Sequence, residues 1–343
     1  MRSAVGYVKL AETANGPIAR PASFAYVWGD ALTELERARP DVRIVNLETA
    51  VTTSEDAALG KGIHYRMHPD NLPCLTAANI DCCVLANNHV LDWGQRGLVE
   101  TVDTLRAAAI RTAGAGRDVE EATAPAVIEM PCGHRVLVFA YGMASSGVGA
   151  DWAADAGRPG VSFLPDLSAH SLEQIARAVR AARSARDLVV VSIHWGSNWG
   201  YRISDQERGF AHALVDVAGV DVVHGHSSHH PKGIEVHRNK LILYGCGDFL
   251  NDYEGISGYE SYRSELTLLY LPSFEPVTGR LVRLTLAPMR IRNFRLNRAQ
   301  DEEVRWLESM LNREGDKLGT RVEREDGERL ALHWDRGAPA LPG

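Results

Sequence analysis

Residues 221–233 read DVVHGHSSHHPKG, and this stretch decides how the fold and the function of the chain are interpreted. It opens with the apolar residues of a buried β-strand and then places four histidines within seven positions, His224, His226, His229 and His230. A single histidine in such a place is most simply a polar turn residue. Four at one strand end favour a functional site, because imidazole is a common metal ligand and titrates near neutral pH.

Short apolar runs alternate with amphipathic stretches on both sides of this segment. The runs rich in Val, Ile and Leu predict strands that are buried on both faces, at residues 41–48, 80–89, 134–142, 186–196, 219–226 and 239–249. Apolar residues spaced by three and four predict helices between them, at residues 28–38, 94–110, 171–184 and 204–219. This alternating order predicts an α/β core with a largely parallel sheet.

The pattern changes after the last of these runs. Residues 263–274 and 280–297 alternate apolar and polar positions around the turn EPVTGR, which predicts a β-hairpin. Residues 301–319 read as a helix, and an exposed tail with the short strand ERLALHW follows. We therefore expect one main domain over residues 1–300 and a C-terminal helix and tail over residues 301–343.

The composition is that of an ordinary soluble globular protein, with 343 residues of which 45% are apolar and 24% charged. A net charge of −7 argues against general nucleic-acid binding. The sequence contains neither a membrane-spanning run nor the apolar centre of a signal peptide, so as it stands we expect a cytoplasmic protein. The cysteines form no CxxC pair and are expected to be reduced: Cys74, Cys82, Cys83, Cys132 and Cys246.

Polar side chains follow several of the predicted strands. They are Asn46 and Glu48, then Asn87, Asn88, His89 and Asp92, then His194 and finally His226. Because ligands of open α/β sheets bind beyond the carboxyl ends of the strands, we expect these groups to converge. Carboxylate, amide oxygen and imidazole together suit divalent cations, singly or as a pair, that polarise an oxygen and ionise water.

Simpler interpretations exist for two of these groups. The Asn-Asn-His segment could cap the helix that begins near residue 94, with Asp92 as its N-cap. His194 stands beside Trp195 and could be a hydrogen-bonded histidine of the core. The recurrence of such residues at successive strand ends favours the metal site over these alternatives.

The loop KGIHYRMHP, residues 61–69, is a candidate wall of a substrate pocket. Lys61, His64, Tyr65 and Arg66 are the residues in it that would contact an anionic substrate.

Three segments resemble the CapA family of capsule-synthesis proteins, which is associated with poly-γ-glutamate biosynthesis and is similar to the calcineurin-like metallophosphoesterases. They are RIVNLETAVTTSE, VLANNHVLDWGQRGLVETVDTL and the long stretch from VVSIHWG to YGCGDF. The resemblance runs from about residue 41 to 249, with weaker agreement to about 298, and carries the NLE, NNH, HWG and GHxxH elements in order. It implies an α/β sandwich of two mixed β-sheets flanked by helices.

The resemblance also implies roles for individual residues. The metal ligands would be Glu48, Asn88, His194, His226 and His229. The catalytic candidates are His89, which would face the leaving oxygen or substrate, and Asp92. The candidates for substrate contact are Asn46, His64, Arg66 and Trp195. We expect two divalent cations, and Mn, Fe, Zn, Mg and Ca all suit such a ligand set.

Two departures from the family pattern stand out. Family members begin with a strand that ends in Gly-Asp, whereas this chain opens on MRSAVGYVKLAE, and Asp30 in VWGD lies in a helical context. Either the start was placed too late or this version lacks that strand and its ligand, and we favour the first interpretation. Asp248 stands where relatives tend to carry Asn, and its role, like those of His224 and His230, stays open.

Three functions are compatible with these features. The first is a metal-dependent, phosphoesterase-like hydrolase linked to capsule or poly-γ-glutamate-type polymer biosynthesis. The second is a metal-dependent peptide epimerase, and the third is a non-catalytic accessory protein of exopolymer assembly. The substrate would be an anionic small molecule, peptide or polymer, and membrane-bound biosynthetic partners fit the family, whose members are often exported or membrane-anchored. The oligomeric state is not indicated.

Overall fold

The parallel strands of the core are divided between two sheets in the computed structural model, which describes residues 4–335 except 131, 132, 326 and 327. One is a three-stranded parallel sheet of order β1-β4-β5: β1 (Ile44–Asn46), β4 (Cys82–Val84) and β5 (Arg111–Ala113). The other has seven strands, with a parallel centre of β8 (Arg135–Met143), β11 (Asp187–His194), β12 (Val222–His226) and β14 (Lys240–Leu243). Its edges are β7 (Ala126–Glu129), β10 (Phe163–Leu164) and β13 (Ile234–His237). The expected parallel core is therefore present but split.

A third, antiparallel sheet has the order β15-β16-β19-β18, with β17 beside β16. Its strands are β15 (Leu266–Phe274), β16 (Leu281–Ile291), β17 (Leu296–Arg298), β18 (Thr320–Glu325) and β19 (Arg329–Trp334). β15 and β16 confirm the predicted hairpin. Two short pairs complete the sheets: β2 (Ala50–Val51) with β3 (Arg66–Met67), and β6 (Ala115–Gly116) with β9 (Gly160–Val161).

The C-terminal segment is part of this third sheet, whereas the sequence predicted an exposed tail. β18 pairs with β19, and β19 pairs with β16. The alternation in TRVERE buries Thr320 and Val322 and exposes Arg321 and Glu323. The many charged residues of this stretch favoured the prediction of an exposed tail. A half-buried strand, however, needs apolar residues only at every second position.

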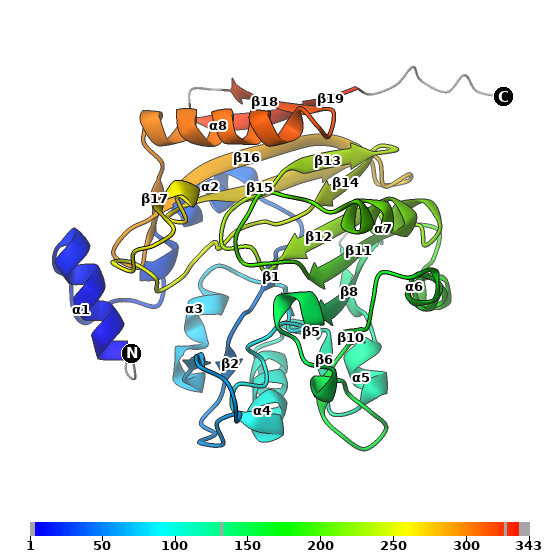
Figure 1. Cartoon of the computed structure of the whole chain (residues 1–343), viewed down its shortest axis with the longest axis horizontal. Helices are drawn as coiled ribbons and strands as arrows, with labels where there is room; N and C mark the ends of the chain where they lie inside the picture. The colour runs from blue at the N-terminus through cyan, green and yellow to red at the C-terminus, as the bar shows by residue number, and fades with distance from the viewer. Residues whose placement is uncertain (1–3, 131–132, 326–327, 336–343) are drawn as a thin grey trace.

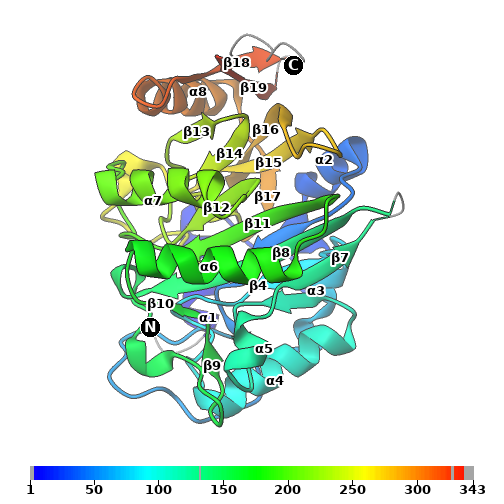
Figure 2. The ribbon, with the colours of Figure 1, turned by 90° about the vertical axis from the view of Figure 1, so that its right-hand side faces the viewer.

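Helices cover the outer faces of the sheets, which confirms the mixed α/β class with helix-flanked sheets. Figure 2 shows α6 (Ala169–Ala182) and α7 (Asp205–Asp216) along one side of the seven-stranded sheet. In Figure 1, α8 (Asp301–Gly315) lies at the top beside the antiparallel sheet and α4 (Gly94–Ala107) lies at the bottom. The remaining helices are α1 (Ala4–Asn15), α2 (Asp30–Ala38), α3 (Pro73–Thr76) and α5 (Val119–Thr123).

The helix ends follow from the local sequence. Ser168 caps α6 by accepting a hydrogen bond from the backbone N–H of Ser171. Ser204 and Glu207 form a capping box at the start of α7. Apolar residues of both helices pack against the same face of the seven-stranded sheet: Ile175, Val179, Phe210 and Leu214 against Phe139, Val191 and Val223.

The packing brings the carboxyl ends of the two parallel sheets together. The parallel register of β11 and β12 places Ser192 beside His224 and His194 beside His226. Residues that follow β1 and β4 approach this pair of strands, so the polar strand ends predicted to share one sheet edge meet between two sheets. Glu48 and Asn88 thus approach His194 from a second sheet and not along one sheet edge.

Two further expectations concern the cysteines and the membrane. Four cysteines are free in the structure, at Cys74, Cys82, Cys83 and Cys246, whereas Cys132 lies outside the described residues. In the described part of the chain, no helix combines the length and the apolar character that crossing a bilayer requires.

The C-terminal hairpin is expected to unfold together with the rest of the protein. Leu330 on β19 has no exposed surface and lies in the core between the sheets. Leu330→Ala should lower the free energy of unfolding by about 3 kcal/mol, because it leaves a cavity in a packed core. Arg321→Ala, on the exposed face of β18, should change it by less than about 0.5 kcal/mol. Urea unfolding followed by circular dichroism measures both, and equal effects of the two substitutions would contradict this packing.

Candidate functional site

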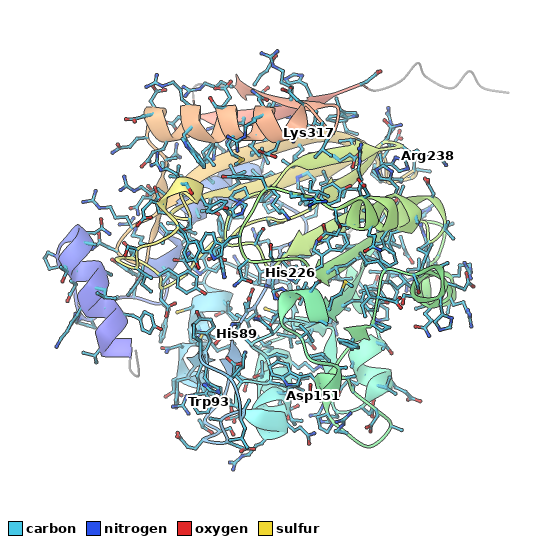
Figure 3. The ribbon with its side chains drawn as sticks, viewed as in Figure 1. His89, Trp93, Asp151, His226, Arg238 and Lys317 are labelled. Carbon is cyan, nitrogen blue, oxygen red and sulfur yellow. The ribbon has the colours of Figure 1, made fainter. Side chains whose placement is uncertain are left out.

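Three side chains from the two parallel sheets meet at one point. Glu48 follows β1, Asn88 follows β4 and His194 ends β11. His194 Nε2 lies 3.2 Å from Asn88 Oδ1 and 3.7 Å from Glu48 Oε1. His89 and His226, labelled in Figure 3, lie on the two sides of the middle of the molecule, below and above this meeting of the sheets.

Asn46 and Asn87 hold the carboxylate of Glu48 in place. Asn46 Nδ2 donates to Glu48 Oε2 at 2.9 Å, and Asn46 Oδ1 accepts from Asn87 Nδ2 at 3.0 Å. Asn87 also accepts from the backbone N–H of His89. Both ends of the Asn46 amide are thereby engaged inside the site. Asn46 orients Glu48, so the structure gives it a supporting place and not the substrate contact expected from the sequence.

Burial sets the protonation of these groups. Desolvation raises the pKa of Glu48 to about 7, and the nearby Asp248 carboxylate adds to this effect. Desolvation lowers the pKa of His194 to about 3, and His89 and His229 lower it further. At neutral pH His194 is therefore a neutral imidazole, which is the form that binds metal ions. His229 and Lys61 partly offset the rise in the pKa of Glu48.

The geometry of this point fits one divalent cation. Two ligands that each lie about 2.1 Å from an ion are about 3.0–3.4 Å apart. The Asn88–His194 separation of 3.2 Å matches this spacing, and the Glu48–His194 separation of 3.7 Å is slightly wider. Within the described residues, however, no three His, Cys, Asp or Glu side chains form a metal cluster. The fit therefore rests on Glu48, Asn88 and His194, and the larger ligand set stays a prediction.

The other two expected ligands make hydrogen bonds elsewhere. His226 Nδ1 lies 2.7 Å from His194 Nδ1, and His226 Nε2 lies 2.8 Å from Ser192 Oγ. His229 Nδ1 lies 2.9 Å from Asp248 Oδ1, and Asn198 Nδ2 lies 3.1 Å from His229 Nε2. Both ring nitrogens of each histidine take part in these hydrogen bonds, and the roles of His226 and His229 as metal ligands stay a prediction. Asp248, whose role the sequence left open, is the partner of His229.

A second group beside this point contains the catalytic candidates. His89 Nδ1 lies 2.7 Å from Asp92 Oδ2, and the backbone N–H of Tyr65 donates to the same oxygen at 2.6 Å. Lys61 contacts the other oxygen of Asp92 and the carbonyl oxygen of Asn88. Burial lowers the pKa of His89, although its bond to Asp92 acts in the opposite direction. Asp92 thus holds the His89 proton at Nδ1, and Nε2 is left as the nitrogen that can exchange a proton.

Asp92 is not the cap of the following helix. α4 begins at Gly94, and its N-cap is Trp93 without a side-chain bond. Asp92 has no exposed surface, and its two oxygens are used by His89, Tyr65 and Lys61. The capping alternative from the sequence is therefore wrong, because the carboxylate turns inward to the histidine.

His64 and Arg66, which were expected to contact substrate, make hydrogen bonds to nearby loop residues. The ring of His64 bonds the carbonyl oxygen of Ala58 at 2.8 Å. The Arg66 guanidinium donates to Ser54 and Glu55 and lies 4.2 Å from the ring centroid of Trp93.

Trp195 is 3% exposed and donates from Nε1 to the carbonyl oxygen of Tyr244 at 3.0 Å. The ring of Trp195 therefore belongs to the core under α7, and its contact with substrate stays a prediction.

The structure adds Tyr253, which the sequence did not indicate, as a partner of Tyr65. Tyr65 and Tyr253 share a hydrogen bond between their hydroxyls at 2.6 Å. The ring of Tyr65 packs 4.2 Å from that of His89, and the ring of Tyr253 packs edge-on, 5.2 Å from that of His229. Tyr65 stands in the pocket loop already singled out, whereas Tyr253 carried no signal as a lone tyrosine in a polar loop.

The two histidines with open roles differ in kind. His224 Nδ1 lies 3.0 Å from Ser192 Oγ, on the inner face of the sheet next to the site. His230 donates from Nδ1 to the carbonyl oxygen of Pro231 and accepts at Nε2 from the backbone N–H of Gly200. His230 is thus a buried structural residue of the loop. Ser192 could have been found as the polar residue inside an otherwise apolar run, two positions before His194.

The bond between His229 and Asp248 should be visible in the pH dependence. Burial opposes protonation of His229, but the bond to Asp248 outweighs burial and raises the pKa of His229 above its usual value. The pair therefore adds stability below the unfolded-state pKa of about 6.5, and this stability is lost as the pH rises through the folded-state pKa. Asp248→Asn should lower the pKa of His229, because the burial that opposes protonation is then countered only by the charge of Glu48. Proton NMR titration of the His229 ring measures this, and an unchanged pKa in the variant would refute the assignment.

The chain is similar to known bacterial proteins over most of its length. The family model described as "Bacterial capsule synthesis protein PGA_cap" matches residues 3–253. A "Probable polyglutamine synthesis accessory protein" of Mycobacterium tuberculosis is 46% identical over 323 residues, which are 94% of this chain and 85% of the relative.

More distant relatives are known from Bacillus. A "Capsule biosynthesis protein CapA" of Bacillus anthracis is 30% identical over 193 residues, 56% of this chain and 45% of the relative. A "PGA biosynthesis protein CapA" of Bacillus subtilis is 29% identical over 208 residues, 60% of this chain and 52% of the relative. The family match spans more than half of the chain and includes every residue of the candidate site. The chain therefore belongs to the PGA_cap family of bacterial capsule synthesis proteins, to which the sequence motifs had pointed.

Proposed function

We propose that this protein is a metal-dependent hydrolase of phosphoesters that acts in the biosynthesis of a capsule or polyglutamate-type polymer. The observation that carries the proposal is the His89–Asp92 pair, at 2.7 Å, beside the point shared by Glu48, Asn88 and His194. A proton-transferring histidine next to a carboxylate, an amide oxygen and a neutral imidazole suits hydrolysis assisted by a divalent cation. The link to polymer synthesis comes from the family and from the names of the relatives.

Glu48, Asn88 and His194 would hold the cation. A bound divalent cation supplies Lewis acidity, which polarises a phosphoryl oxygen and acidifies water. Its charge would also return Glu48 to the ionised form, since a nearby cation lowers the pKa of a carboxyl group.

The protein's own groups would move the proton. Asp92 keeps the His89 proton at Nδ1 and so directs Nε2 toward the substrate. Nε2 can then accept a proton and pass it to the leaving oxygen. Lys61 contacts Asp92 and the Asn88 carbonyl oxygen, so one cationic side chain supports both halves of the site. Its charge also suits an anionic substrate.

Substitution of the site residues should separate metal binding from proton transfer. We expect hydrolysis of p-nitrophenyl phosphate or its diester only with Mn²⁺, Zn²⁺ or Mg²⁺ present. His194→Ala should abolish this activity and weaken metal binding. His89→Asn should lower kcat by about 10²–10⁴-fold with metal binding kept, because it removes only the proton transfer. His237→Ala, at a surface pair with Asp216, is the control and should leave both unchanged.

Two outcomes would count against the hydrolase. A protein that binds metal at His194 but hydrolyses no phosphomonoester or diester would refute it. Uptake of deuterium from D₂O into a peptide substrate would instead favour a metal-dependent epimerase.

A non-catalytic accessory role is the second candidate. It is favoured by the lack of a three-residue His, Cys, Asp or Glu cluster among the described residues, and by the accessory role in the name of the mycobacterial relative. It predicts binding of poly-γ-glutamate or a membrane-bound biosynthetic partner that His194→Ala and His89→Asn leave intact. Loss of binding in these variants would exclude it in favour of the catalytic proposal.

A further inference from the structure

A chain of hydrogen bonds runs from the candidate metal point along the inner face of the seven-stranded sheet. It begins at Asn88 Oδ1, 3.2 Å from His194 Nε2, and His194 Nδ1 lies 2.7 Å from His226 Nδ1. It continues from His226 Nε2 to Ser192 Oγ at 2.8 Å and from Ser192 Oγ to His224 Nδ1 at 3.0 Å. The parallel register of β11 and β12 places Ser192 beside His224 and His194 beside His226.

The direction of every bond in this chain follows from its first member. Asn88 Oδ1 can only accept, so His194 carries its proton at Nε2 and has a lone pair at Nδ1. His226 must then donate from Nδ1 and accept at Nε2. His226 Nε2 then accepts a hydrogen bond from the Ser192 hydroxyl, and Ser192 Oγ accepts one from His224 Nδ1–H. All three imidazoles are neutral in this arrangement.

A cation at the candidate point is incompatible with this direction. Metal binding needs a lone pair at His194 Nε2, whereas the present arrangement puts a proton there, directed at Asn88 Oδ1. The same proton also keeps the Asn88 oxygen from acting as a ligand.

We propose that binding of a divalent cation at His194 reverses this chain as a unit, with Ser192 and His224 as positioning residues. The proposal rests on the metal site of the proposed function. After reversal His194 carries its proton at Nδ1 and donates to His226 Nδ1. His226 then donates from Nε2 to Ser192, and Ser192 donates to His224 Nδ1, which leaves the His224 proton at Nε2. The number of protons is the same in both directions, so the reversal neither takes up nor releases a proton.

Ser192 is the residue on which the reversal depends. A hydroxyl donates one hydrogen bond and accepts others, so it can serve the chain in both directions. Ser192 has no exposed surface, and His194 and His226 are 1% and 5% exposed. Water therefore has little access to these bonds, and removal of the hydroxyl leaves a buried His226 nitrogen without its partner. His224 is less buried than Ser192, His194 and His226, and it is the last member of the hydrogen-bond chain.

Nitrogen NMR of protein labelled at its histidine rings shows which ring nitrogen carries the proton. It therefore gives the direction of the hydrogen-bond chain without any activity measurement. In metal-free protein we expect protons at His194 Nε2, His226 Nδ1 and His224 Nδ1. Titration with Zn²⁺, which is diamagnetic, should move all three to the opposite nitrogens together. A His224 proton that stays at Nδ1 in the Zn²⁺-saturated protein would overturn the proposal.

Zn²⁺ affinity measured by calorimetry tests the role of Ser192. Ser192→Ala should weaken Zn²⁺ binding by about 10- to 100-fold, the range typical of losing outer-shell support of a metal ligand, because His226, the partner of His194, then lacks the acceptor that it needs after the reversal. Ser192→Thr keeps the hydroxyl and should restore most of the affinity if the strand accepts the extra methyl group. Ser146→Ala is the matched control, because the buried Ser146 hydroxyl bonds the backbone carbonyl of His194 at 2.6 Å and not its ring. It should change the affinity by less than about threefold.

The results separate the two proposals. Failure of the wild-type protein to bind Zn²⁺ at His194 would refute the metal site and the coupling together. Zn²⁺ binding with an unchanged affinity in Ser192→Ala would refute the coupling and leave the metal site standing. Thermal unfolding of each variant by circular dichroism identifies a variant that fails to fold, and the NMR result on wild-type protein decides the proposal in that case.

Discussion

The parallel register between β11 and β12 is the constraint on which the candidate site depends. It pairs Ser192 with His224 and His194 with His226, and so sets four polar side chains next to one another on a buried sheet face. Polar groups removed from water have to find hydrogen-bond partners. These four find them in each other and in Asn88, which belongs to the facing sheet. Pairing of two strands thus ties the two parallel sheets together at the place where chemistry is proposed.

Charge compensation distinguishes this site from the rest of the interior. Several other carboxylates with little exposed surface have arginine partners: Arg298 and Arg329 contact Glu34, and Arg208 contacts Glu235. Glu48 has an asparagine amide and a neutral histidine instead, and burial raises its pKa to about 7. Glu48 is partly buried, with 25% of its side chain exposed, and desolvation makes its ionised form less favourable. A divalent cation of the kind proposed would favour the ionised form.

Loops connect the catalytic candidates to both sheets. The loop with Lys61 and Tyr65 surrounds Asp92 and thereby fixes the ring of His89. The hydroxyl bond between Tyr65 and Tyr253 joins this loop to the segment after β14, next to His229. Residues far apart in the sequence therefore fix one another's orientation, and Tyr65, which lies outside the sequence motifs, helps to hold the ring of His89.

The sequence by itself determined the family, the alternation of strands and helices and the polar residues at the strand ends, because these depend on local periodicity and on motif order. It could not determine that the parallel strands divide into two sheets, that residues 320–325 pair with β19, or that Asp92 turns to His89 instead of capping α4. It also could not separate Glu48, Asn88 and His194 from His226 and His229, since all five are equally polar strand-end residues. Only the tertiary structure decides which ring nitrogen meets which partner, because a hydrogen bond depends on distances of about 3 Å between residues that lie far apart in the chain.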